Sequence, residues 1–325
     1  MTESNRLSRR GLLRVGGAVG AATVAGLVTP TLAQADAMGS GLSKLELPPA
    51  TADVTPFTLR VPESMLKDLR RRLGQTRWPD HELVDDWTQG VPLPRLQRLV
   101  EHWRTRYDWR RAERFLNKSG QHRTVIDGLG IHLLHVRSRH PKAMPLLLTH
   151  GWPGSVLEFR HVIGPLTDPT RYGGRAEDAF HVVIPSLPGY GLSDKPRETG
   201  WDRFRTAEAW SKIMSRLGYD HYLAQGGDWG GVIATQLGRM RPKGLLGIHL
   251  NLANVVPANP DPDPTPEEKL AMSQLDTFSK DGAGYQHIQS TRPQTIGYGL
   301  TDSPVGQAGW RGFPPKCGHR WLCGE

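Results

Sequence analysis

The apolar positions between residues 62 and 107 repeat at the three- and four-residue spacing of amphipathic helices. Pro62 and Glu63 are typical of a helix start, so the first apolar stripe predicts a helix that begins there. A second stripe predicts another helix, and Pro79 in the segment between them is expected to keep the two apart. The stripes consist of Met65, Leu66, Leu69 and Leu73, and of Leu96, Leu99, Val100, Trp103 and Tyr107. We interpret both stripes as faces of a hydrophobic core.

From residue 123 onward the pattern changes to short apolar runs. Two runs, 124–126 and 131–136, flank Asp127-Gly128 and predict an antiparallel hairpin. Four further runs are almost continuously apolar, at 145–149, 180–185, 222–225 and 245–250. A helical stripe precedes the third of these, with Ala207, Trp210, Ile213, Met214 and Leu217. Continuous apolar strands separated by helical segments predict the α/β class, with a mostly parallel sheet covered by helices on both faces.

The run 222–225 leads into Gly226-Gly227-Asp228-Trp229-Gly230-Gly231, and a helical segment follows. Small residues two before and two after Asp228 suit a sharp strand-to-helix turn, because side chains there would clash across the turn. The N-terminus of the following helix would stabilise negative charge on the carboxylate. A carboxylate nucleophile forms an alkyl ester, which suits epoxides and alkyl halides rather than amides. The alternative is a glycine-rich loop with a surface aspartate.

Two other loops follow predicted strands, at the sheet edge where open α/β folds place their sites. In His150-Gly151-Trp152-Pro153-Gly154-Ser155, a backbone N–H can complete an oxyanion hole, and the residue after the nucleophile can donate the second N–H. The alternative for this loop is a plain Gly/Pro turn. In the loop 185–193 the glycines are interpreted as backbone requirements, and Tyr190 can be a packing residue.

Composition narrows the functional classes. The 325 residues carry a formal charge of +9, of which residues 1–35 contribute +3 and residues 311–325 contribute +2. In the rest of the chain, positively and negatively charged residues are interspersed, and no aromatic–basic stacking motif is present. Nucleic-acid binding is therefore not indicated. Both cysteines, Cys317 and Cys323, fall near the C-terminus, and with His319 they lack the paired spacing of a metal site.

The N-terminal segment has the pattern of a targeting signal. Arg9 and Arg10 precede an uncharged run from residue 15 to residue 35 that is rich in Ala, Gly, Val and Leu. Together with Ala33-Gln34-Ala35 this resembles a bacterial twin-arginine export signal. We therefore expect cleavage before Asp36 and a periplasmic or extracellular product. The alternative, a membrane anchor, is disfavoured because the run is rich in glycine and only mildly apolar.

These motifs together resemble epoxide hydrolases of the microsomal and juvenile-hormone type, which are α/β-hydrolases with an N-terminal extension. The similarity runs from about residue 57 to residue 310. It includes Arg77-Trp78-Pro79, the region from Trp103 to Trp109, the loop 150–155, Gln225-Gly226-Gly227-Asp228-Trp229-Gly230, Gly284-Tyr285-Gln286-His287-Ile288-Gln289 and Thr291-Arg292-Pro293. The resemblance implies that Asp228 is the nucleophile that opens an epoxide on the way to a diol. It also implies that Tyr285 is one of two cap tyrosines that protonate the departing oxygen. Backbone N–H groups of Trp152 and Trp229 would form the oxyanion hole, and no cofactor or metal is implied.

The C-terminal part departs from this resemblance. Tyr298 has no match to the second cap tyrosine and is interpreted as a packing residue. The family continues with the rest of the cap, further strands, an acid and a histidine, whereas here the pattern is lost from Arg311 onward. The histidines after Asp228 are His249, His287 and His319, none in the setting of a catalytic base. We therefore expect an α/β-hydrolase fold that is truncated or frame-shifted at its C-terminus, with impaired cleavage of the ester.

The expected organisation has five parts. They are a signal peptide at 1–35, an epoxide hydrolase N-terminal region at 36–140, a partial α/β-hydrolase core at 141–252, the start of the cap at 253–310, and a divergent tail at 311–325. The expected partners are a small-molecule epoxide and water, with no membrane span after signal removal. Two alternatives stay open. A haloalkane dehalogenase would share Asp228 and Trp229 but would need no proton donor such as Tyr285, and a fragment without turnover would at most bind ligand.

Overall fold

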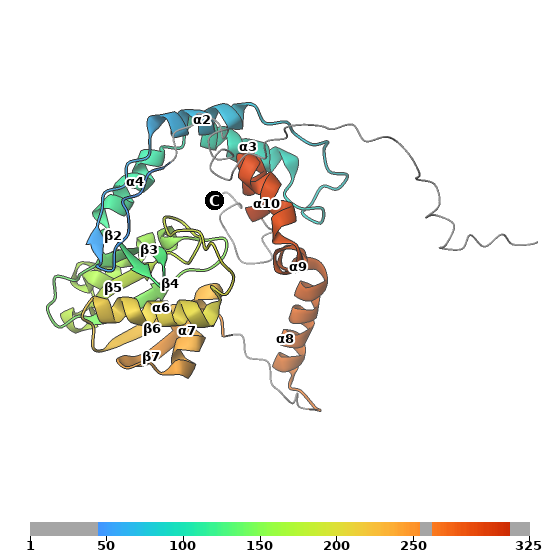
Figure 1. Ribbon diagram of the computed structural model, residues 1–325. Coiled ribbons are helices and arrows are strands. Elements are labelled where there is room, and N and C mark those ends of the chain that lie inside the picture. The colour runs from blue at the N-terminus through green and yellow to red at the C-terminus, as the bar shows by residue number, and fades with distance from the viewer. Residues whose placement is uncertain (1–44, 254–261, 313–325) are drawn as a thin grey trace, which may run out of the picture. The chain divides into compact units, whose positions relative to one another are not determined.

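A mixed sheet of seven strands organises the chain (Figure 1), in the order β1-β2-β3-β5-β4-β6-β7. The computed structural model describes residues 45–253 and 262–312, all within the unit Ser43–Glu325. The expected signal peptide at 1–35 and the tail from residue 313, with Cys317, His319 and Cys323, lie outside the described residues. The strands are β1 (Thr55–Pro56), β2 (Gln121–Ile126), β3 (Leu129–Val136), β4 (Met144–Thr149), β5 (Phe180–Pro185), β6 (Tyr222–Gly226) and β7 (Leu245–Leu250).

The strand directions divide the sheet into two halves. The hairpin of β2 and β3 is confirmed, and its turn residues Asp127 and Gly128 both have positive φ (48° and 81°), as a two-residue hairpin turn requires. The neighbours β5, β4, β6 and β7 are parallel, as the continuous apolar runs predicted. Strands β1, β2, β3 and β5 pair antiparallel, so the complete sheet is mixed. The predicted α/β-hydrolase architecture is thereby observed, with an antiparallel half at its N-terminal side.

Helices cover both faces of the sheet because neighbouring strand residues point to opposite sides. In β5, Val183 packs into the cluster formed with α6 (Arg203–Arg216) and α7 (Trp229–Met240), and Trp210 of α6 is fully buried there. Val182 and Ile184 face the opposite cluster, where Leu116 and Val156 cover the sheet. α7 packs against β6 and β7, and α6 lies beside α7 (Figure 1). The second cover includes α4 (Trp109–Lys118), the 3₁₀ helix η2 (Val156–His161) and α5 (Ile163–Thr167).

The two predicted N-terminal helices are present as α2 (Glu63–Gly74) and α3 (Leu93–Thr105). The second apolar stripe was extended too far, to Tyr107, because the sequence contains a helix start that the periodicity did not reveal. Asp108 accepts a hydrogen bond from the backbone N–H of Arg110 at 2.9 Å and thereby caps the next helix, α4. Residues 45–54 form no helix or strand.

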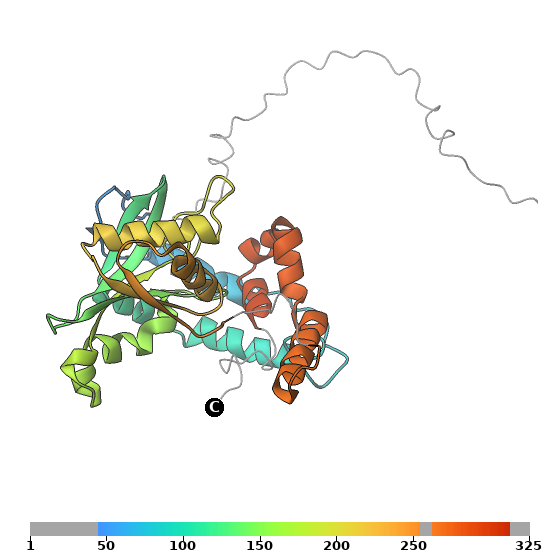
Figure 2. The same ribbon diagram turned by 90° about the horizontal axis from the view of Figure 1, so that it is seen from below.

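The described C-terminal part consists of helices. They are α8 (Pro266–Thr277), the π-helical turn η5 (Phe278–Gly282), α9 (Gly284–Thr291), α10 (Pro293–Asp302) and α11 (Pro304–Arg311). Two 3₁₀ turns, η3 (Pro169–Tyr172) and η4 (Ala176–Asp178), lie earlier in the chain, between α5 and β5. Val305 of α11 packs with Leu73 of α2 and Val100 of α3, so the two helical regions lie side by side (Figure 2). None of the helices described here is long and apolar enough to span a membrane.

Candidate active site

Asp228 lies in a sharp turn between β6 and α7. Its backbone has φ 52° and ψ −127°, a conformation that residues other than glycine rarely adopt. Gly226 and Gly230 make the turn possible, because a Cβ at Gly226 would collide with the Gly230 carbonyl and a Cβ at Gly230 with the Thr149 carbonyl. The predicted strand-to-helix turn is thus observed, and the small residues occupy the positions where the sequence required them. A strained backbone at such a position is typical of functional sites.

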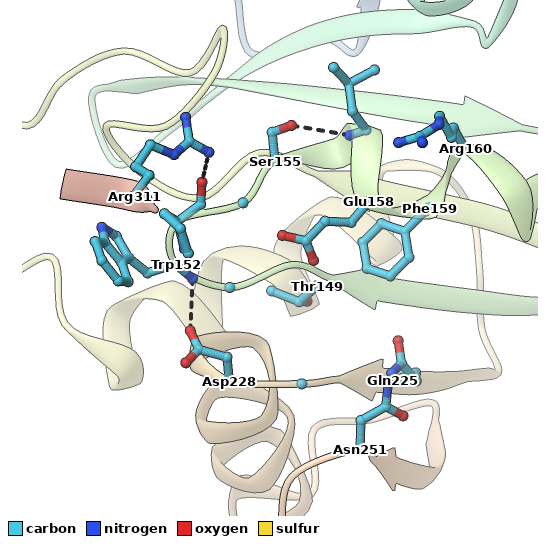
Figure 3. A pocket seen from close by; sticks show the side chains of 15 residues that line it. Thr149, Trp152, Ser155, Glu158, Phe159, Arg160, Gln225, Asp228, Asn251 and Arg311 are labelled. Atoms are coloured by element: carbon cyan, nitrogen blue, oxygen red, sulfur yellow. Dashed lines mark hydrogen bonds between the residues drawn. The ribbon is translucent and has the colours of Figure 1, made fainter. Parts of the chain in front are cut away.

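The loop after β4 approaches Asp228 from the other side. The backbone N–H of Trp152 donates a hydrogen bond to Oδ1 of Asp228 at 2.7 Å, as Figure 3 shows. Gly151 permits this approach, since a Cβ there would collide with the same carboxylate. Trp229 is the first residue of α7, where backbone N–H groups have no partner within the helix, and its side chain is 50% exposed. The loop 150–155 and the turn at Asp228 therefore form one site.

Tyr285 comes to this site from α9. Its ring stacks on the indole of Trp152, with centroids 4.8 Å apart and an interplanar angle of 10°. Both rings line a cavity of about 500 Å³ together with Asp228, Trp229, Val232 and Leu252. We call this the aromatic cavity. Tyr298, in α10, is 70% exposed, so its interpretation as a packing residue is wrong.

A second cavity lies on another side of Asp228, with a volume of about 640 Å³. We call it the polar cavity, and its lining includes Thr149, Trp152, Glu158, Phe159, Asn251 and Arg311. Figure 3 shows the Glu158 carboxyl pointing from η2 toward the side of this cavity where Trp152 and Asp228 lie. Sequence reasoning missed Glu158. The available signal was its position three residues after Ser155. One turn of a helix that begins after Ser155 places the side chain of residue 158 back over the loop.

Glu158 has a perturbed acidity. The residue is exposed by its accessible area, but that area opens into the polar cavity, whose walls separate the carboxyl from much of the bulk water. This desolvation, followed by the negative charge of Asp228, raises the pKa of Glu158 to about 7. A hydrogen bond to the Ser155 backbone and the positive charge of Arg311 oppose the shift. Glu158 can therefore change its charge near neutral pH.

Tyr190 and His150 support the site from the sheet side. The two rings are 5.6 Å apart, and burial, with the Asp228 charge as a smaller cause, raises the pKa of Tyr190. His150 is buried, its Nδ1 donates to the Gly151 carbonyl at 3.1 Å, and its Nε2 accepts from the backbone N–H of Leu187 at 3.2 Å. Desolvation lowers the pKa of His150 to about 4. His150 is thus a neutral residue that holds loops together.

The later histidines lie elsewhere. His249 is an exposed residue of β7, and His287 is an exposed residue of α9. Among residues 45–253 and 262–312, no histidine lines either of the two cavities that contain Asp228. Within the same ranges, no group of three or more His, Cys, Asp or Glu side chains is placed to hold a metal ion. The polar groups that line the two cavities with Asp228 include the carboxyl of Glu158, the guanidinium of Arg311 and the phenol of Tyr285.

The fold and this turn together define the class, an α/β-hydrolase fold with an aspartate in the sharp turn between β6 and α7. Residues 144–284 match the family model for the alpha/beta hydrolase fold, and residues 54–159 match the model for the epoxide hydrolase N terminus. The chain belongs to the epoxide hydrolase family.

Relatives and solved structures agree with this membership. A putative epoxide hydrolase of Stigmatella aurantiaca is 60% identical over 258 residues, which cover 79% of this chain and 59% of the relative. The structure of Aspergillus niger epoxide hydrolase matches with a TM-score of 0.72 and 32% identity, covering 81% of this chain and 70% of that one. The crystal structure of the juvenile hormone epoxide hydrolase from the silkworm Bombyx mori matches with a TM-score of 0.73 and 32% identity. This match covers 80% of this chain and 65% of that one. The chain spans about three fifths of the length of the curated relatives it matches.

Proposed function

We propose that this protein opens epoxides through an ester on Asp228 and converts them to diols. The carboxylate oxygen of Asp228 that Trp152 does not hold attacks an epoxide carbon, and the ring C–O bond breaks. Tyr285 gives its proton to the released oxygen. When water later adds to the ester, the N–H groups of Trp152 and Trp229 stabilise the oxyanion, which is the arrangement that acyl-transfer sites use.

The observation that carries the proposal is the stack of Tyr285 on Trp152, whose N–H binds Asp228. Tyr285, the proposed acid, and Asp228, the proposed nucleophile, line the same cavity. This pairing favours an epoxide over an alkyl halide, because an alkoxide leaving group needs a proton and a halide does not. The runner-up activity, haloalkane dehalogenation, uses the same carboxylate and predicts chloride release from a chloroalkane.

Mass spectrometry tests the first half of the reaction. Incubation with styrene oxide should add the mass of one epoxide to the peptide that contains Asp228, and Asp228→Ala should give no adduct. Tyr285→Phe should slow the adduct formation, because the leaving oxygen loses its proton donor. Chloride release from 1-chlorohexane without any epoxide adduct would contradict the proposal and support the dehalogenase.

We further propose that the ester is cleaved slowly, so that the adduct accumulates. Support comes from the two cavities around Asp228, since the described residues that line them include no histidine to activate water. Stopped-flow mixing followed by mass spectrometry should therefore show adduct formation ahead of diol release. A diol burst without a detectable adduct would contradict this part of the proposal.

We also propose that the protein is exported by the twin-arginine route. The support is the pair Arg9 and Arg10 ahead of the mild apolar run, with Ala33-Gln34-Ala35 before Asp36. The substrate would then be met outside the cytoplasm, in keeping with a role in detoxification.

A further inference from the structure

Gln286 lies beside the hydroxyl group of Tyr285 at the aromatic cavity. Its side-chain Nε2 donates a hydrogen bond to the Tyr285 oxygen at 3.2 Å, and both residues line the cavity together with Asp228. We propose that Gln286 is a positioning residue, which directs the Tyr285 hydroxyl and stabilises the phenolate that remains after Tyr285 gives up its proton. This inference rests on the proposed function, because it concerns the proton that assists opening of the epoxide.

Helix α9 contributes a polar face to the aromatic cavity. The face consists of Tyr285, Gln286, Gln289 and Ser290, at the spacing of residues that lie on one side of a helix. Residues that are adjacent in a helix do not face each other directly. The contact between Gln286 and Tyr285 therefore requires a long side chain that carries a donor at its end, and glutamine meets this requirement.

The hydrogen bond from Gln286 sets the direction of the Tyr285 hydroxyl proton. The stack on Trp152, with an interplanar angle of 10°, covers one face of the Tyr285 ring, so the oxygen is approached at the ring edge. A phenol oxygen can accept one hydrogen bond while its own O–H donates another. Because Gln286 occupies an acceptor position of this oxygen, the O–H proton points away from Gln286.

The charges around Tyr285 give this hydrogen bond a chemical role. Asp228 is the other titratable group among the described residues that line the aromatic cavity, and His287 is an exposed neighbour on α9. A nearby carboxylate disfavours a second negative charge on the phenol oxygen, whereas a hydrogen bond donated to that oxygen favours it. Gln286 thus opposes the effect of Asp228.

The proton that Tyr285 gives up is accounted for in the first half of the reaction. An oxygen of Asp228 bonds to an epoxide carbon, the ring C–O bond breaks, and the Tyr285 proton moves to the released oxygen. The hydrogen bond from Gln286 becomes stronger at this point, because its acceptor is now charged. Tyr285 then recovers a proton from solvent, and the resting state of the phenol is restored.

The exposure of Gln286 limits the size of the effect. Water competes for its amide group, so loss of the hydrogen bond should raise the pKa of Tyr285 by roughly one half to one unit. Only part of this shift should appear in the rate, because proton transfer is incomplete in the transition state. We therefore expect adduct formation to slow by roughly 2- to 3-fold, well below the roughly 100-fold effect of losing a general acid.

A series of substitutions at Gln286 tests the proposal without epoxide. Gln286→Met removes the donor, Gln286→Lys supplies a cationic donor, and Gln286→Glu places a carboxylate beside the phenol. These residues have similar helix propensities, so α9 should be retained. NMR of protein labelled with ¹³C at Cζ of tyrosine, with the signal assigned by Tyr285→Phe, measures the pKa of Tyr285. This pKa should rise in Gln286→Met, rise further in Gln286→Glu and fall in Gln286→Lys.

The rate of adduct formation with styrene oxide provides the second readout. It should fall by roughly 2- to 3-fold in Gln286→Met, fall further in Gln286→Glu and not fall in Gln286→Lys. In a Tyr285→Phe background, Gln286→Met should cause no additional loss, because Gln286 acts through the Tyr285 hydroxyl. Gln294→Met changes an exposed glutamine of α10 that lines neither cavity containing Asp228. It serves as the matched control and should change neither the pKa nor the rate.

The outcomes separate this inference from the function on which it rests. An unchanged pKa of Tyr285 in folded Gln286→Met protein that still forms the adduct would overturn the assignment of Gln286 alone. Equal slowing by Gln286→Met with and without the Tyr285 hydroxyl would do the same. Absence of any adduct in folded wild-type protein would overturn the proposed function and this inference together. Circular dichroism of the same samples establishes whether each variant is folded.

Discussion

Replacing Asp228 by glycine should stabilise the protein relative to replacing it by alanine. Both variants lose the carboxylate and its hydrogen bond from Trp152, so the comparison isolates the backbone. Asp228 has φ 52° and ψ −127°, which glycine adopts freely and alanine does not. Strain at such a position costs about 1–3 kcal/mol, while the extra freedom of glycine in the unfolded chain costs about 0.5–1 kcal/mol. Taking the middle of each range leaves Asp228→Gly more stable by about 1 kcal/mol.

Urea unfolding followed by circular dichroism measures this difference directly, and thermal unfolding gives an independent value. At about 2–4 °C per kcal/mol for a domain of 150–250 residues, Tm should rise by roughly 2–4 °C from the alanine to the glycine variant. The same pair of changes at Asp220, which has no positive φ, should favour alanine or show no difference. If Asp228→Gly is no more stable than Asp228→Ala, the turn holds no strain and the reasoning is refuted.

Three other perturbations test separate parts of the structure. Burial lowers the pKa of His135 to about 4 from its ordinary 6.5, so the folded protein disfavours protonation and loses stability as pH falls from 6.5 toward 4. His135→Gln should reduce that slope by up to about 1.4 kcal/mol per pH unit, measured by urea unfolding at pH 7 and pH 5. Leu133→Ala removes a fully buried side chain of β3 and should cost about 2–5 kcal/mol in the same assay. Changing Arg9 and Arg10 to lysine should keep the product in the cytoplasm, and unchanged export in cell fractionation would contradict the twin-arginine proposal.

The order of strands and helices in the core could be predicted because its signals are local. Hydrophobic runs located β4 to β7, and the Asp127-Gly128 pair located the hairpin turn. The turn at Asp228 was equally visible, since glycines are the residues that allow such close backbone approaches. The start of α4 was missed because its cap depends on one side chain, Asp108, within a run that also fits the preceding helix. The relative direction of neighbouring strands was harder to predict. β3 pairs antiparallel with β5, and a local hydrophobic pattern contains no information about the pairing of segments so far apart in the sequence.

Glu158 shows where local reasoning ends at the candidate site. Tyr285 was found because it stands in a recognisable motif, and in the structure its ring stacks on Trp152. Glu158 stands among charged and apolar neighbours of a short 3₁₀ helix, and its spacing from Ser155 is a weak signal compared with the motif around Tyr285. Its altered acidity arises from Asp228, which lies 70 positions later in the chain, and from the walls of a cavity that several elements form. The pKa of a carboxyl group depends on its neighbours in space, and such neighbours cannot be identified from the adjacent sequence.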